Sequence, residues 1–459
     1  MVASRSRRTG VRRALLLPPL ALSAIVASVA LHPTAAATPT PTPPRTATPS
    51  EPAGVDPVPS VTASPETSLT PTVAPSPGPQ AGSPPVVEPP QSITRPRLAP
   101  QTRLALQARL DRLRERYAIP GISVAIVLPD GSSWSGVSGF ADVPDKVAVT
   151  RSTSFAIASV SKTFTAALIL ALAEEGRIDL DAPVRRYLPG LKKVSSKVRV
   201  RQLLDHTSGL RDYFFHPSID RQLLSRPDRR WDSALAFRYV GKPYFEPGKG
   251  WHYSNTNYLV LGMIAEAVGK EPIADQVRAR FLEPLGLEHT WYQPEDAAPT
   301  EVAHGYRFES ASTAAPPIDL SDGTPLVPFT SVVTAAGAAG GFASTARDLA
   351  QWAHHLYGGE VLRPEYLTAM IDPGATTALK SSIPYGYGTQ VVEIDGHKTF
   401  GHSGRLLGFR SAIRYLPDQG VAIAVLTNQS RTDPAAIVRN MLRIALTPVD
   451  QGCGCRQRR

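Results

Sequence analysis

The feature that most constrains this chain is an apolar run from Thr163 to Ala173, which directly follows Ser159-Val-Ser-Lys162. Glu174-Glu175-Gly176 then supplies a stop, with glycine at the expected helix C-terminus. A helix that is apolar almost all round is buried in a core. We therefore expect a buried helix with Ser159 at its N-terminus.

Ser159 and Lys162 are three residues apart, so on a helix their side chains share one face and lie within reach of each other. The N–H groups at a helix N-terminus are unpaired and the dipole there is positive. A desolvated lysine has a lowered pKa, and its neutral form can take the proton of a neighbouring hydroxyl. The alternative is that Ser159 is an N-cap and Lys162 a solvated residue of the first turn.

The first hundred residues differ in composition from the rest. Residues 1–37 begin with arginines, continue into an apolar stretch and end in Ala35-Ala36-Ala37. This pattern predicts a cleaved secretory signal, with an uncleaved membrane anchor as the alternative. Residues 38–100 hold 19 of the 45 prolines and predict a disordered linker. We expect one folded domain over 101–446 and a flexible tail over 447–459.

Charge and cysteine content exclude some functions. The net charge of +10 includes five arginines within residues 1–37, and no basic stripe interleaved with aromatic residues occurs in the sequence. Nucleic-acid binding is therefore not expected. The two cysteines, Cys453 and Cys455, both lie in the tail, so the fold uses no buried disulfide framework and their role stays open.

Strand patterns occur at both ends of the expected domain. An amphipathic helix over 101–116 precedes two strands, 122–128 and 133–140, joined by an Asp130-Gly131 turn. Residues 177–330 show few strand signals and predict a mostly helical insertion. Later strands are expected over 388–394, 399–401, 411–416 and 421–427, with a closing helix over 435–446. The fold class is α/β (α+β): one antiparallel sheet flanked by helices, built from N- and C-terminal parts, with an inserted helical lobe.

Two further motifs follow Ser159-x-x-Lys162 in the chain, Tyr253-Ser-Asn255 and His402-Ser-Gly404. In this order and at this spacing, the three motifs resemble those of the serine β-lactamase and penicillin-binding superfamily. They are most similar to class C β-lactamases and D-alanyl-D-alanine carboxypeptidases. The stretches 205–210, 284–287 and 340–349 are similar as well, and the resemblance covers about 105–446. It implies a β-lactamase/transpeptidase-like fold with no cofactor and no metal.

The resemblance implies that Ser159 attacks a carbonyl carbon and forms an acyl-enzyme. Lys162 and Tyr253 would form the proton-transfer pair. Which of the two deprotonates Ser159 stays open.

The resemblance also implies the substrate-binding groups. Asn255 would hydrogen-bond the substrate amide, and His402, Ser403 and Gly404 would line the substrate site. The backbone N–H groups of the nucleophile and of Arg405 would form the oxyanion hole.

His402 stands where many relatives have lysine. If the imidazole is charged, it can help to hold a substrate carboxylate; the alternative is that it only donates a hydrogen bond to Tyr253 or Ser161. A second histidine, His206, is expected to fix a loop through hydrogen bonds and not to bind a metal.

The expected function is a secreted serine hydrolase, either a D-alanyl-D-alanine carboxypeptidase or β-lactamase-like. Its substrate would be a small peptide, a β-lactam or an ester, with peptidoglycan as a further candidate, and the protein is expected to be a monomer. The alternatives are an esterase or amidase on the same scaffold and a non-catalytic sensor of cell-wall fragments. The Gly-x-Ser-x-Gly elbow of ordinary esterases is absent from the sequence, so an esterase would also use Ser159.

Overall fold

The computed structural model describes residues 98–308 and 316–447. The predicted signal over 1–37, nearly all of the predicted linker, and Cys453 and Cys455 lie outside these ranges. None of the helices within the described ranges is both long enough and apolar enough to cross a lipid bilayer.

A seven-stranded sheet joins the two ends of the domain, with strand order β3-β2-β1-β12-β11-β10-β9 and every pairing antiparallel. The N-terminal strands are β1 (Gly121–Val127), β2 (Ser133–Asp142) and β3 (Val147–Ala148). The C-terminal strands are β9 (Gln390–Ile394), β10 (His397–Leu406), β11 (Phe409–Leu416) and β12 (Val421–Thr427). Pairing of β1 with β12 confirms the predicted sheet built from both ends of the domain.

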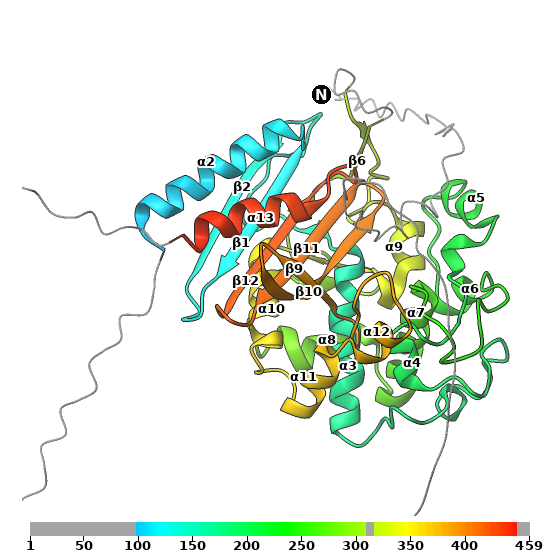
Figure 1. The fold of residues 1–459 in the computed structure, drawn as a ribbon. Coiled ribbons are helices and arrows are strands. Elements are labelled where there is room, and N and C mark those ends of the chain that lie inside the picture. The colour runs from blue at the N-terminus through cyan, green and yellow to red at the C-terminus, as the bar shows by residue number, and fades with distance from the viewer. Residues whose placement is uncertain (1–97, 309–315, 448–459) are drawn as a thin grey trace, which may run out of the picture. The chain divides into compact units, whose positions relative to one another are not determined.

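The sheet is covered on both faces, as Figure 1 shows. Helices α2 (Pro100–Arg116) and α13 (Pro434–Ala445) lie on one face, and Val124 and Ile126 of β1 pack in their cluster. The alternate residues Ala125 and Val127 belong to the larger core on the other face. Side chains of a strand alternate between faces, so β1, which is buried on both faces, is apolar except for Ser123.

The predicted buried helix is α3 (Ser161–Glu174), whose residues are all buried except two in its last turn. Phe164 stacks on Trp352 of α10 (Ala346–Tyr357), with ring centroids 4.2 Å apart. Gly176 follows the helix with a φ of +70°, a left-handed conformation that suits glycine at a helix C-terminus. The helix and its stop are confirmed.

The middle block is mostly helical, as predicted. Its helices are α4 (Val200–Leu204), α5 (Ile219–Leu224), α6 (Ser233–Phe237), α7 (Asn255–Gly269) and α8 (Ile273–Val277), with the three-residue turns η2 (Val184–Arg186) and η3 (Tyr213–Phe215) and the π-helical turn η4 (Arg278–Leu282). Helices α9 (Thr330–Ala336), α11 (Pro364–Ile371) and α12 (Gly374–Ala378) and the turn η5 (Gly337–Ala339) complete the set.

Short strands that the sequence analysis did not predict also occur. Strands β4 (Phe155–Ala156), β8 (Phe342–Ser344) and β5 (Trp291–Tyr292) form a small sheet, and β6 (Tyr306–Arg307) pairs with β7 (Ile318–Asp319). Strands of two or three residues are too short to show a period in sequence.

Strand β10 is longer than predicted and contains the third motif in its interior. It pairs with β11 from Phe400 to Leu406, whereas its pairing with β9 ends at Gly401. The edge of β10 is therefore free of β9 from His402 onward, where the motif begins.

Candidate active site

A strained turn places Ser159 between β4 and α3. Ala158 has a φ of +49°, which is uncommon for a residue with a Cβ and clusters at functional sites. Ser159 follows in the turn η1 (Ala158–Val160) and is 5% exposed. The serine therefore lies just before α3, at the N-terminus of the buried helix, as predicted.

Lys162 lies at the centre of the site. Its Nζ is 3.0 Å from Ser159 Oγ, 2.8 Å from Asn255 Oδ1 and 2.6 Å from the Ala339 carbonyl oxygen. The side chain is fully buried. Burial lowers the pKa of Lys162 to about 7, against the opposing charge of Asp212. The alternative of a solvated first-turn lysine is therefore wrong, and a large fraction of this amine is neutral at pH 7.

The Tyr253 phenol faces the same pair. Lys162 Nζ lies 5.0 Å from the centre of the Tyr253 ring, and the hydroxyl is buried with no hydrogen-bond partner among the described residues. Burial raises the pKa of Tyr253, and the nearby Ser159 hydroxyl partly opposes this rise. The phenol is therefore protonated at neutral pH and has a proton to give.

Asn255, the first residue of α7, is held at both ends of its amide. Oδ1 accepts from Lys162, and Nδ2 donates to Asp212 Oδ2 at 2.8 Å. The side chain is 2% exposed.

Asp212, Ala339 and Tyr385 belong to the site but were missed by sequence reasoning. The signal for Asp212 is an acidic residue directly before the aromatic run Tyr213-Phe214-Phe215. Such a residue reads as an ordinary cap, and Asp212 does cap η3 through Phe214 N.

The open edge of β10 carries Ser403 and Arg405. Ser403 N and Oγ both donate to Gln390 Oε1 at 3.1 Å, beyond the end of β9 pairing. Backbone N–H groups two residues apart on a strand point to the same edge. The Arg405 N–H therefore points to this edge too.

Gly404 allows β10 to touch the nucleophile turn. A Cβ at this position would lie 2.3 Å from the Ile157 carbonyl oxygen and 3.1 Å from Ala158 Cβ. The facing residue Ser411 donates from Oγ to the same carbonyl at 2.6 Å. Only glycine fits this close approach.

His402 is fully buried. Its Nδ1 is 2.7 Å from the Ser403 carbonyl oxygen and its Nε2 is 2.9 Å from the Tyr385 hydroxyl. A carbonyl only accepts, so Nδ1 carries the proton and Nε2 accepts from Tyr385. Burial, reinforced by Lys162, lowers the pKa of His402 well below 6.5. The imidazole is therefore neutral, and its partner is Tyr385, not the expected Tyr253 or Ser161.

His206 fixes a loop, as predicted. Its Nδ1 accepts from Ser254 N at 3.2 Å and from Asn257 Nδ2 at 2.9 Å. The ring packs on Tyr253 with centroids 4.4 Å apart. His206 therefore packs against the Tyr253 ring and helps to hold the phenol in place.

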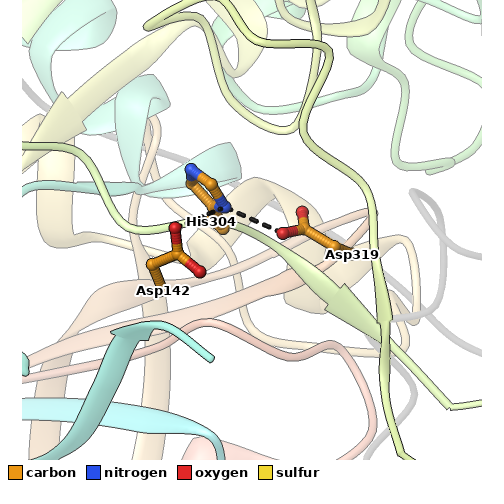
Figure 2. Close-up of side chains that lie close together, drawn as sticks. All are labelled: Asp142, His304 and Asp319. Carbon is orange, nitrogen blue, oxygen red and sulfur yellow. Dashed lines mark hydrogen bonds and ion pairs between the residues drawn. The ribbon is translucent and has the colours of Figure 1, made fainter. Parts of the chain in front are cut away.

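A separate cluster of Asp142, His304 and Asp319 brings three possible metal ligands together (Figure 2). His304 Nδ1 lies 2.8 Å from Asp319 Oδ2 and 3.7 Å from Asp142 Oδ2. Hydrogen bonding to Asp319 raises the pKa of His304, and the pKa of Asp319 is lowered in return. A protonated His304 thus lies beside two carboxylates, Asp142 of β2 and Asp319 of β7.

Comparisons with known proteins agree with this geometry. The family model described as Beta-lactamase matches residues 106–447. Penicillin-binding protein 4 of Amycolatopsis lactamdurans is 29% identical over 342 residues, which cover 70% of this chain and 84% of that protein.

Solved structures of similar proteins include two amide hydrolases. The D-amino acid amidase from Ochrobactrum anthropi SV3, complexed with L-phenylalanine amide, has a TM-score of 0.64 at 28% identity and covers 75% of this chain and 98% of its own. A D-stereospecific amidohydrolase from Streptomyces sp. has a TM-score of 0.59 at 29% identity, and the match covers 72% of this chain and 94% of the amidohydrolase chain. With the antiparallel sheet, the buried Ser159–Lys162 pair and a family match over most of its length, the chain belongs to the Beta-lactamase family of serine hydrolases.

Proposed function

We propose that this protein hydrolyses the amide bond that follows a D-amino acid residue, through an acyl-enzyme on Ser159, with D-alanyl-D-alanine peptides as its substrates. The observation that carries the proposal is the contact of 3.0 Å between Lys162 Nζ and Ser159 Oγ. Similarity to a penicillin-binding protein and to D-stereospecific amide hydrolases supports the D-configuration. β-Lactams would acylate the same serine.

Lys162 is the base in this proposal. A neutral amine has two N–H donors and one lone pair, and the Asn255 Oδ1 and Ala339 oxygens take the two donors. The lone pair then faces Ser159 and takes its proton as Oγ attacks the substrate carbonyl. The backbone N–H groups of Ser159 and Arg405 stabilise the oxyanion.

Tyr253 is the acid that completes acylation. Its buried hydroxyl is free to donate to the leaving nitrogen, so that the C–N bond breaks and an amine departs. The raised pKa of Tyr253 favours recovery of a proton from the Lys162 ammonium. Water then attacks the ester with the same groups in reverse, which releases the acid and restores Ser159.

The second candidate is hydrolysis of D-amino acid amides or esters that lack a carboxylate on the leaving group. It is favoured by the neutral state of His402, which offers no cation where many relatives have lysine. A non-catalytic sensor is disfavoured, because it would not need a buried lysine with a lowered pKa beside the serine.

The test is incubation of the full chain with a fluorescent penicillin, followed by turnover of a D-Ala-D-Ala tripeptide, a D-amino acid amide and a p-nitrophenyl ester. We expect covalent labelling in the wild type, none in Ser159→Ala, and release of D-alanine from the tripeptide. Faster turnover of the amide than of the tripeptide would favour the second candidate. A protein that neither labels nor turns over any of these substrates would overturn the proposal.

We also propose that the protein acts outside the cytoplasm, because residues 1–37 have the composition of a secretory signal. Fractionation of expressing cells and sequencing of the mature N-terminus test this. An uncleaved N-terminus in the cytoplasmic fraction would contradict it.

A further inference from the structure

Asp212 is a buried carboxylate outside the three motifs, and it is 1% exposed. Its Oδ1 accepts from Phe214 N at 3.0 Å, and its Oδ2 accepts from Asn255 N at 3.1 Å and Asn255 Nδ2 at 2.8 Å. These donors are uncharged amide groups. Burying a carboxylate is energetically unfavourable, so a charge here indicates a role beyond capping a three-residue turn.

The contacts of Asn255 indicate that purpose. A carboxylate offers only acceptors, so the Asn255 Nδ2 must face Asp212 and its Oδ1 must face Lys162. If the amide were turned over, Nδ2 would point an N–H group at the Lys162 amine. That donor would occupy the lone pair that the base needs for Ser159.

We propose that Asp212 is a positioning residue: it fixes the Asn255 amide with Oδ1 toward Lys162 and thereby keeps the lysine lone pair on Ser159. The inference rests on the proposed function of the Ser159–Lys162 pair. Asp212 touches no reacting atom and acts through Asn255.

Asp212 also acts through its charge. The carboxylate raises the pKa of Lys162, against the larger lowering by burial. The titratable groups around the amine are Asp212, Tyr253, Tyr258, His206 and His402. Both tyrosines have raised pKa values and both histidines have pKa values well below 6.5. At neutral pH these four are uncharged. Burial raises the pKa of Asp212 itself, and the hydrogen bonds from Asn255 and Phe214 and the charge of Lys162 oppose that rise. These donors hold the carboxylate that tunes the base.

The experiment compares Asp212→Asn with wild type in the full chain, using Asp348→Asn as the matched control. Asp348 is also a buried carboxylate, 3% exposed, and it accepts from His289 N and Thr290 Oγ1. The first readout is the pKa of Lys162 from the ¹³Cε shifts of labelled lysine, assigned with Lys162→Ala. The second is the acylation rate by fluorescent penicillin as a function of pH.

We expect Asp212→Asn to lower the pKa of Lys162 by about one unit. The acid limb of the acylation profile should move to lower pH by the same amount, while the plateau falls about tenfold to a hundredfold. Asp348→Asn should change neither the Lys162 pKa nor the profile. A Lys162 pKa and a plateau that both stay at their wild-type values in Asp212→Asn would reduce Asp212 to a structural cap and overturn the proposal.

A second variant, Asp212→Ser, tests the proposal if Asp212→Asn folds poorly. Asp212→Ser keeps an acceptor for Phe214 N but loses the charge and the second oxygen, so it should show the same fall in the Lys162 pKa. The lysine titration needs no substrate. Wild type that reacts with no substrate would therefore contradict the proposed function and leave the Asp212 test intact.

Discussion

Lys162 Nζ lies 3.0 Å from Ser159 Oγ, with the Ala339 carbonyl oxygen 2.6 Å away, and the lysine side chain is fully buried. This arrangement solves the problem of a serine nucleophile that has no histidine. The interior makes the ammonium unfavourable, and two oxygens hold the neutral amine in one orientation.

Ser159→Ala should abolish covalent labelling and all hydrolysis while the protein stays folded, because the residue supplies the attacking oxygen. The measurement is labelling by fluorescent penicillin together with a thermal melt. The matched control is Ser161→Ala, which loses the hydrogen bond from Phe342 N and should cost about 1 kcal/mol of stability but keep labelling. Labelling that survives in Ser159→Ala would show that another residue is the nucleophile.

Lys162→Ala and Tyr253→Phe should each lower the acylation rate by about a hundredfold or more. The double variant should be little slower than either single variant, because groups that form one proton relay are non-additive. Stopped-flow acylation of all four proteins measures this. If the two losses multiplied, the groups would act independently.

The acylation rate should rise with pH through about 7 and then level off, because burial lowers the pKa of Lys162 to about 7 and only the neutral amine is a base. His402 is neutral over this range and should add no step. The Michaelis constants for a carboxylate peptide and a neutral ester, from pH 5 to 8, should therefore run in parallel. A Michaelis constant that rises with pH for the peptide but not for the ester would show that His402 is charged at low pH.

Gly404→Ala should reduce acylation strongly, because its Cβ would lie 2.3 Å from the Ile157 carbonyl oxygen and would push β10 away from the nucleophile turn. Gly190→Ala is the matched control, since a Cβ there meets no atom within 4 Å. The measurement is the acylation rate and the melting temperature of both variants. Equal rates in Gly404→Ala and wild type would mean that the turn and the strand need not touch.

The His304–Asp319 pair should give a small pH-dependent contribution to stability. The pKa of His304 is raised in the folded state, so its contribution is complete below about 6.5, the unfolded value, and is lost as pH rises through the folded pKa. The pKa of Asp319 is lowered, so its contribution is present above about 4 and is lost as pH falls through its folded value. His304→Gln should cost about 0.5 kcal/mol at pH 5.5 and less at pH 8.5.

Urea unfolding of His304→Gln and wild type at these two pH values measures the difference. His355→Gln serves as the control, because His355 forms a comparable pair with the exposed Glu360 away from this cluster. A cost for His304→Gln that grows toward pH 8.5 would contradict the assigned direction of the His304 pKa shift.

The sequence by itself determined the elements that rest on local pattern. Continuous apolarity predicted α3, and shorter apolar runs bounded by turn residues predicted β1 and β12, since elements buried on all sides keep few polar residues. The three short motifs, in their order along the chain, carried the family resemblance that placed Ser159, Lys162 and Tyr253 in one site.

Only the tertiary structure decided how these residues are tuned. The acceptors of Lys162 lie 93 and 177 residues away in the chain, at Asn255 and Ala339, and no period or spacing encodes such contacts. Asp212 reads in sequence as an ordinary cap and His402 as a residue that could be charged. In the structure, Asp212 is a buried carboxylate that accepts a hydrogen bond from Asn255. His402 is a buried, neutral imidazole that accepts a hydrogen bond from Tyr385. A pKa depends on desolvation and on neighbours in space, and both are properties of the folded chain.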